Sequence, residues 1–525
     1  MISPSEDFQY DSCSSYGICS INPRTSALQR VLLLYLKLIG KYAMRLLEKG
    51  ERDENAEEFI LNTITIAVSN PEFTEESFIS AVSTFKEKLP PIIDRYNKIF
   101  EEEDFKGESL ESLELFTQTN DIISAIKFGE KRFRDLISKI PAKVRDFYNI
   151  MLVIAKSISI NLLDLESYKK TYDKGFLTVL KLLNLINLEE QDILQLKNEI
   201  YNAVLVDNEI MSLIHSSQEE RYGIQDVAEV SYTTVPSKAV LVVGSNIREL
   251  ETVLESLKDV DIDVYTHDDM IVAHTFPKFS EYEHLKGQYG QGVENCLLDF
   301  ATFPGPIILT KHSLHNIENF YRGRLFTTDY ACPKGVIKIE KNDFKEVIRS
   351  AEKAKGFKRG KRCESVEIGY KYDEVMKLIK EKLELGKYDS LFLIGLEGYS
   401  LEQQSYFDKL IKLLPENVLV ISFSYNFRCD DLIYINACYD NYSIMRIFDE
   451  IKKYELKTVI FVPKCNRNSI SQMVYFSKDM NTKVFVGKCT PIILNPSLMS
   501  TLQTEFLING ITSAKRDLEI IFSDK

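Results

Sequence analysis

Five of the six histidines in this chain lie close together, within residues 264–336. An imidazole at the end of a buried strand can bind a metal ion or transfer a proton, and in α/β folds chemistry gathers at such strand ends. A histidine in this setting is more often satisfied by backbone hydrogen bonds than by a metal. The five residues are His267, His274, His284, His312 and His315.

Cysteines are the second group of residues with metal-binding chemistry. The chain has nine, and two of them, Cys13 and Cys19, are separated by five residues in a loop-like segment over residues 1–24. Such a pair can reach one metal cluster, but a [4Fe–4S] cluster normally takes four thiolates. The pair leaves three interpretations open: two free surface thiols, a cluster completed by a second chain, or a different metal.

Composition limits the compartment and the partners. An odd number of cysteines spread over 525 residues is atypical of a disulfide framework and favours a reducing compartment. The apolar run Val31–Leu36 is far shorter than the ~20 residues of a membrane span, and no secretion signal is recognisable. A net charge of −13 argues against a nucleic-acid partner. We therefore expect a cytoplasmic protein that binds neither membranes nor nucleic acid.

The amino-terminal part of the chain has a helical pattern. Between residues 25 and 234, apolar residues recur with helical spacing, and proline or glycine breaks divide the pattern into short-looped helices. This predicts a helical bundle domain over residues 25–234. The predicted helices are Ser26–Gly50, Glu54–Val68, Glu75–Leu89, Pro91–Glu102, Thr119–Ser138, Ala142–Asn161, Tyr168–Leu185 and Leu188–His215.

The rest of the chain has an α/β pattern. A strand over Lys238–Gly244, a helix over Arg248–Lys258 and a strand over Asp261–Thr266 form a βαβ unit, which predicts a parallel sheet. We expect two Rossmann-like α/β domains, over residues 235–371 and 372–525. Further predicted strands are Pro306–Thr310 in the first domain, and Ser390–Gly395, Asn417–Phe423, Leu432–Asn436, Lys457–Pro463 and Lys483–Gly487 in the second.

A short basic segment lies between these two domains. Lys353–Arg362, with the sequence KAKGFKRGKR, carries six lysines and arginines. The simplest interpretation is an exposed linker. The alternative is a binding site for an anion or an acidic partner.

Several strings in the histidine-rich stretch resemble one known family. VYTHDDM, which begins at Val264, is followed by DFATFPGPIILT and then by YRGRLFTT. These strings, in this order, resemble the central domain of the hybrid-cluster proteins, also called prismane proteins or hydroxylamine reductases, which are distant relatives of nickel carbon monoxide dehydrogenases. The resemblance extends weakly to both ends of the chain. It implies a helical domain followed by two α/β domains.

The resemblance also implies an iron–sulfur–oxygen cluster held by thiolates, one imidazole and two carboxylates. A serine hydroxyl is a poor replacement for a thiolate, and leucine has no lone pair to give. Only Cys438 persists as the same residue, and Asp269 persists as a shortened carboxylate. The family's first cysteine pair falls on Phe8–Ser12, which has no thiol. The seven expected ligand positions fall on Ser245, Asp269, Ser313, Leu396, Ser424, Cys438 and Asn466.

These replacements predict a family scaffold that has lost most of its ligands. We expect a non-catalytic binding or regulatory homologue with no cofactor, and an iron–sulfur cluster only if the alignment of the ligands is wrong. What remains of the site is either a filled, solvated region without a function or a hydroxyl-lined pocket that binds a small polar molecule. A simpler metal site built from Asp269, Cys438, His312 or His274 is a further interpretation.

The alternative function is that of a hydroxylamine or nitrogen-oxide reductase with an altered metal site. A different small-molecule enzyme has less support, because the sequence shows no phosphate loop, metalloprotease motif or spaced nucleophile–base pair. The expected partners are a second copy of the chain or a cluster-bearing relative in a mixed dimer.

Overall fold

The computed structural model describes residues 23–68, 73–99, 115, 119–186, 192–290, 295–314, 317–395, 401–423, 432–437, 442–465, 467–488 and 496–523. The chain divides into two compact units. The first contains Met1–Ile210, Ile470–Lys478 and Cys489–Leu507. The second contains Met211–Ser469, Asp479–Lys488 and Ile508–Lys525.

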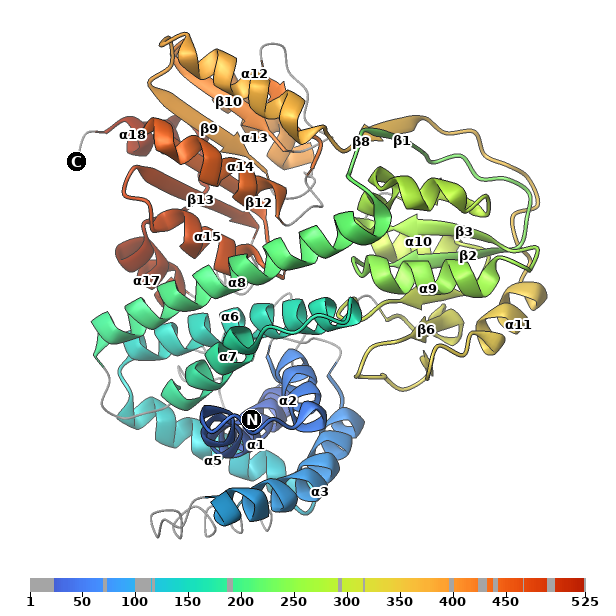
Figure 1. Ribbon diagram of the computed structural model, residues 1–525, viewed down its shortest axis with the longest axis vertical. Helices are drawn as coiled ribbons and strands as arrows, with labels where there is room; N and C mark the ends of the chain where they lie inside the picture. Colours follow the sequence, from blue (N-terminus) through green and yellow to red (C-terminus); the bar gives the residue numbers. More distant parts are fainter. Residues whose placement is uncertain are drawn as a thin grey trace, which may run out of the picture. The chain divides into compact units, whose positions relative to one another are not determined.

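The first unit is helical, as the sequence predicts. Two helices from the carboxyl-terminal third, α15 and α17, join it. Ser497 and Thr501 of α17 donate hydrogen bonds to Asp146 Oδ2 of α6, at 2.6 and 2.9 Å. The helices are α1 (Pro23–Glu48), α2 (Glu54–Ala67), α3 (Glu75–Ile99), α5 (Ile122–Lys139), α6 (Ala142–Ser167), α7 (Asp173–Leu185), α8 (Ile193–Tyr222), α15 (Ser469–Ser477) and α17 (Pro496–Phe506) (Figure 1). Helix α8 belongs to this unit as far as Ile210, and its last residues belong to the second unit.

One predicted boundary in this unit is wrong. The expected break at Pro90 is absent, because α3 continues through Pro90 and Pro91 to Ile99. Its buried residues Phe85, Leu89, Ile92 and Tyr96 keep a helical spacing of four, three and four across the two prolines. Packing of this face outweighs the local cost of a proline inside a helix.

The first sheet of the second unit is parallel and has six strands. Their order is β4-β3-β2-β5-β6-β7. The strands are β2 (Ala239–Val243), β3 (Asp263–His267), β4 (Leu285–Gln288), β5 (Ile307–Leu309), β6 (Leu325–Thr327) and β7 (Ile337–Lys338), with helices α9 (Ile247–Leu257), α10 (Cys296–Thr302) and α11 (Lys345–Lys353) and 3-10 helix η3 (Asp268–Thr275). All five residues of β2 are buried, as its unbroken apolar sequence predicts.

The second sheet repeats the same topology. Its order is β11-β10-β9-β12-β13-β14, and the strands are again parallel. The strands are β9 (Ser390–Ile394), β10 (Val418–Ser422), β11 (Ile433–Tyr434), β12 (Lys457–Lys464), β13 (Thr482–Lys488) and β14 (Ile508–Gly510), with helices α12 (Tyr372–Glu384), α13 (Leu401–Lys412), α14 (Ser443–Ile451) and α18 (Ala514–Phe522) (Figure 1). The predicted fold class, a helical region followed by two parallel α/β sheets, is confirmed.

A two-stranded antiparallel ladder flanks the first sheet. β1 (Ala228–Ser231) pairs with β8 (Ser365–Ile368), so that Ala228 faces Ile368 and Ser231 faces Ser365. Val230 and Ile368 pack against Ile271 of η3, and these three side chains form a small separate core. The chain therefore enters and leaves the first sheet at adjacent points.

Candidate functional site

The strand orders locate a potential site in each sheet. In sequence order, both sheets read 3-2-1-4-5-6, and the direction of winding reverses between β2 and β5 and between β9 and β12. In folds of this kind, ligands bind outside the carboxyl ends of the strands at this switch point. Ser245 follows β2 and Ser313 follows β5. In the sequence, Leu396 follows β9 and Asn466 follows β12.

Several of the predicted site residues lie outside the residues that the structure describes. Ser245, Asp269 and Ser313 are described, as are His274 and His312. The others are Cys13, Cys19, Leu396, Ser424, Cys438 and Asn466. The geometry below is therefore that of the first α/β sheet.

The loops after β2 and β5 meet closely at Gly244. This glycine has φ of +125°, and a Cβ atom added to it would lie 2.2 Å from both Ser313 Oγ and Thr310 Oγ1. Ser313 is buried, and its hydroxyl lies 3.4 Å from that of Thr310. Only glycine allows this approach. The switch point therefore brings the backbone beside Ser245 against the Ser313 side chain.

Asp269 extends from the neighbouring strand. Val243 of β2 pairs with His267 of β3, and Ser245 and Asp269 each lie two residues beyond this pair. Asp269 is half-buried on η3. Its carboxylate is therefore at the same edge of the sheet as the two serines.

Glu249 of α9 connects the loops that carry these residues. Its Oε2 atom accepts a hydrogen bond from the backbone N–H of Lys311 at 2.9 Å and another from Thr328 Oγ1 at 2.7 Å. The helix is capped by Asn246, whose Oδ1 accepts from Glu249 N at 3.0 Å. One carboxylate thus fixes the ends of β5 and β6 relative to α9.

Asp329 fixes the loop that carries His312. Its Oδ2 accepts from His312 N at 2.5 Å, and its Oδ1 accepts from Ala331 N at 3.0 Å. His312 has a left-handed backbone with φ of +62°, a conformation that is costly for a residue with a side chain. Burial raises the pKa of Asp329, although these two N–H groups act in the opposite direction. Sequence reasoning missed Glu249 and Asp329; the position of Asp329, two residues after β6, was the available signal.

The other described histidines of the stretch, His267, His274 and His284, each have a hydrogen-bond partner within the protein. His315 lies outside the described residues. His267 Nε2 lies 3.0 Å from Asp299 Oδ2, and both residues are buried. His274 Nε2 lies 2.9 Å from Thr266 Oγ1, which donates to Gln288 Oε1 at 2.6 Å. Because the Thr266 hydroxyl donates its proton to Gln288, its oxygen is free to accept a hydrogen bond from the Nε2–H of His274. Burial lowers the pKa of His274 to about 4, so this ring is neutral at pH 7.

Sulfur donors are not gathered at this edge of the first sheet. The described free cysteines are Cys296, Cys332 and Cys363, and Cys296 is buried in α10. Among described residues, no group of three or more histidines, cysteines or carboxylates is placed to hold a metal ion. The described donors around Ser245 and Ser313 are hydroxyls, carboxylates and the imidazole of His312, and they do not fit the thiolate-rich set of an iron–sulfur cluster. Cys465, directly after β12, is disulfide-bonded.

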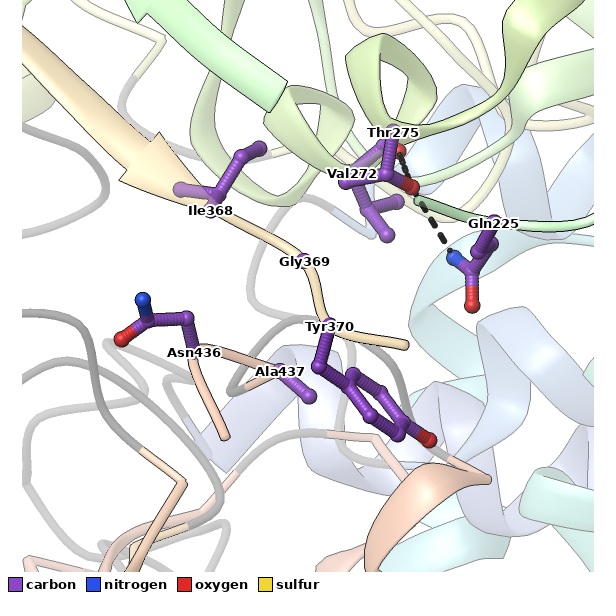
Figure 2. Close-up of a pocket in the computed structure, with 8 residues that line it drawn as sticks. All are labelled: Gln225, Val272, Thr275, Ile368, Gly369, Tyr370, Asn436 and Ala437. Carbon is purple, nitrogen blue, oxygen red and sulfur yellow. Dashed lines mark hydrogen bonds between the residues drawn. The ribbon is translucent and has the colours of Figure 1, made fainter. Parts of the chain in front are cut away.

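A small hollow of about 260 Å³, which includes open solvent, lies elsewhere in the second unit. Gln225 Nε2 donates to Thr275 Oγ1 at 3.1 Å on one side, and the Tyr370 ring lies near Ala437 on the other (Figure 2). None of the three described ligand positions, Ser245, Asp269 and Ser313, lines it. Its lining residues are Gln225, Val272, Thr275, Ile368, Gly369, Tyr370, Asn436 and Ala437.

Comparison with known proteins identifies the family. The profile described as "Prismane/CO dehydrogenase family" matches residues 9–519, which is nearly the whole chain. The chain belongs to this family. Prismane-family relatives named hydroxylamine reductase are similar along their full length. The protein of Acidiphilium cryptum is 26% identical over 96% of this chain and 94% of its own, and that of Thermodesulfovibrio yellowstonii is 24% identical over 97% of both chains.

One solved structure is also similar to this chain. It is described as "NiZn[Fe4S4] and NiNi[Fe4S4] clusters in closed and open alpha subunits of acetyl-CoA synthase/carbon monoxide dehydrogenase". The similarity covers 99% of this chain and 88% of that one, with a TM-score of 0.48 and 11% identity.

Family membership corrects one expectation from the sequence. The prediction that no cofactor is bound is wrong, because the Prismane/CO dehydrogenase family and its hydroxylamine reductases are iron–sulfur proteins. The physical reason for the error is that the prediction weighed the substituted positions one by one, whereas a cluster draws its ligands from the whole chain. Separately, none of the helices in the described ranges has the length and apolar character needed to cross a bilayer.

Proposed function

We propose that this prismane-family chain acts mainly by binding, as a regulatory homologue of the hydroxylamine reductases, and does not reduce hydroxylamine at the rate of those enzymes. One observation carries the proposal. At the switch point of the first sheet, the two positions that correspond to an imidazole and a thiolate ligand are Ser245 and Ser313, and Gly244 packs against Ser313. The proposal concerns catalysis, and it does not deny the chain an iron–sulfur group.

A neutral hydroxyl at both positions has a direct chemical consequence. Serine oxygen is protonated near neutral pH and is a weak ligand for the iron of a mixed iron–sulfur–oxygen centre. A centre that lacks ligands from one sheet has altered charge and geometry, and these determine its redox behaviour. Iron held by the rest of the chain would therefore not reproduce the family's reaction.

The second candidate function is a hydroxylamine or nitrogen-oxide reductase with an altered metal site. Asp269 favours it, because a carboxylate stands two residues beyond β3 where the family resemblance implies a longer one. His312 lies at the same edge and its backbone is fixed by Asp329. In this second candidate, the carboxylate of Asp269 and the imidazole of His312 would serve as metal ligands.

One experiment separates the two functions. The full chain is produced without oxygen and with iron supplied, and its iron and sulfide content is measured. Hydroxylamine reduction is then followed with a chemically reduced viologen, beside the Acidiphilium cryptum relative at equal iron concentration. The proposal expects turnover at least about a hundredfold slower per iron than that of the relative, the size of effect that altered metal surroundings produce.

The result that overturns the proposal is turnover per iron within about tenfold of the relative. In that case, Asp269→Asn should abolish the activity if the second candidate is right. Asp268→Asn, at the adjacent position, is the control for a general loss of charge.

The partner and the compartment follow as further parts of the same proposal. A regulatory homologue needs a target, and a second copy or a cluster-bearing relative in a mixed dimer would supply one. We infer a cytoplasmic location from the odd number of cysteines spread over the sequence and the reducing compartment that this favours.

A further inference from the structure

The basic segment Lys353–Arg362, here called the basic strap, is held in a defined path along the first sheet. Phe357 N donates to Ser237 O at 2.8 Å, and Ser237 N donates to Phe357 O at 3.1 Å. Gly356 N donates to Pro304 O at 3.3 Å, and Lys238 Nζ donates to the carbonyl of Ala354. The strap is therefore part of the fold and not a loose connection.

The second half of the strap is fixed in the same way. Lys361 exchanges two backbone hydrogen bonds with Thr234, at 3.0 and 3.1 Å. A Cβ atom on Gly356 would lie 2.4 Å from Ser237 O, and one on Gly360 would lie 2.6 Å from Thr234 O. The two glycines let the strap lie directly on residues 234–238.

Phe357 anchors the middle of the strap. Its ring centroid lies 5.5 Å from that of Tyr265, 5.6 Å from that of Phe303 and 5.9 Å from that of Tyr289. Phe357 is the only aromatic residue of the strap, and its ring packs within this aromatic cluster. Phe357 is half-buried, so the strap has no fully exposed aromatic side chain for stacking.

The charged side chains of the strap face the solvent. All six lysines and arginines of the strap are exposed, and no ion pair within the described part of the chain involves them. Six like charges in ten residues repel one another, and the fixed backbone prevents them from separating. They form a cationic strip on a chain whose net charge is −13. The six are Lys353, Lys355, Lys358, Arg359, Lys361 and Arg362.

The position of the strap separates it from the candidate site. Ser237 and Lys238 precede β2, and Pro304 precedes β5. The strap thus crosses the amino ends of the strands, whereas Ser245 and Ser313 follow their carboxyl ends. Its charges are therefore not part of the candidate site at the switch point.

We propose that the basic strap is a docking surface for a compact acidic patch on a partner protein. A single-stranded nucleic acid is disfavoured, because such binding needs exposed rings for base stacking. An anionic membrane is an extended surface and would also face the acidic remainder of the chain, which it would repel. A compact acidic patch can meet the strap alone. This inference does not depend on the proposed function.

The test measures binding of fluorescein-labelled poly-L-glutamate to the full chain by fluorescence anisotropy. The strap variant is Lys355→Gln/Lys358→Gln/Arg359→Gln. The matched control is Lys334→Gln/Lys377→Gln/Lys409→Gln, three exposed lysines elsewhere, which changes the net charge by the same amount. We expect at least about tenfold weaker binding by the strap variant and less than about twofold by the control, with both differences reduced at about 0.15 M salt.

Two results would overturn the proposal. Equal weakening in both variants would mean that net charge alone determines binding. The chain could instead bind poly-uridylate RNA or phosphatidylserine vesicles more tightly than poly-glutamate, with the same loss in the strap variant. That result would mean that the partner is a nucleic acid or a membrane and not an acidic protein. Equal melting temperatures of the two variants and the unaltered chain show that the comparison is between folded proteins.

Discussion

Ser245 and Ser313 stand where the family resemblance implies an imidazole and a thiolate, and the structure brings their loops together at Gly244. Their position after strands could be predicted from the apolar runs that precede them. Glu249 and Asp329 could not be identified in that way, because each acts through backbone N–H groups that only the folded chain brings within reach. Side chains that arrange a loop leave no spacing pattern in the sequence.

The first prediction restores the implied ligands. In Ser245→His/Ser313→Cys, the sulfur replaces a hydroxyl of similar size, so the packing against Gly244 is retained. We expect the iron bound per chain after anaerobic reconstitution to rise, with iron affinity about tenfold higher. Ser245→Gln/Ser313→Ala is the control, since it has neither ligand. Equal iron in the two variants would contradict the alignment of these positions with the family's ligands.

The second prediction concerns His274 and acid. Its pKa is lowered to about 4 in the folded chain, against 6.5 in the unfolded chain. The unfolded chain therefore takes up the proton first, and the free energy of unfolding falls as the pH drops from about 6.5 towards 4, by up to about 3 kcal/mol. His274→Gln keeps a donor towards Thr266 and does not titrate.

Urea unfolding at a series of pH values between 7 and 4.5 checks this prediction, with midpoints compared between the two proteins. The variant should lose less stability over this range than the unaltered chain. Parallel curves for the two proteins would show that His274 does not set the acid sensitivity.

At the scale of elements, long amphipathic helices and strands within apolar runs were predictable, including the short strands β5 and β11, but several other short strands were not. β2, β9 and β10 have five residues each, and their apolar residues are consecutive, with a single serine at one end of β9 and of β10, so the sequence marks them clearly. β4, β6, β7 and β14 have two to four residues each, too few for a period to show, and were not predicted. The break expected at Pro90 failed for a different reason, because a tertiary contact face overrides a local preference.

The third prediction tests the close approach of two elements at Gly244. In Gly244→Ala, the new methyl group would meet two hydroxyl oxygens at 2.2 Å, and φ is +125°. We expect a loss of at least about 3 kcal/mol in the free energy of unfolding. Gly386→Ala is the matched control: φ is +62° and nothing lies within 4 Å, so only the backbone cost of about 1 kcal/mol applies. Chemical denaturation of both variants gives the comparison, and equal losses would mean that the two loops can separate easily.

At the scale of the whole molecule, one topology occurs twice. Both sheets have the order 3-2-1-4-5-6, and each carries a glycine with positive φ, Gly244 or Gly395, directly after its first strand. The sequence predicted two parallel sheets, but it could not give their strand order, because order depends on pairing between distant segments. The repeated order explains why the implied ligands fall after corresponding strands of the two sheets.

The fourth prediction is that residues 224–370 fold as a separate chain. Both ends of this segment meet in the β1–β8 ladder, and Val230, Ile271 and Ile368 form a core that joins the ladder to the domain. We expect cooperative thermal unfolding followed by circular dichroism. The control is residues 237–356, which lack the ladder and most of the basic strap, and this fragment should melt at a lower temperature. Gradual unfolding of the longer fragment would show that it depends on the rest of the chain.

The ladder between β1 and β8 has a mechanical consequence. The chain enters at Ala228 and leaves at Ile368, which face each other, so a force that pulls these two points apart acts across the ladder and not along it. The hydrogen bonds then break one pair after another, from Ala228–Ile368 towards Thr234–Lys361 and the basic strap, at low force. Under tension, the β1–β8 ladder would open from its outer end while the strands of the first parallel sheet are still paired.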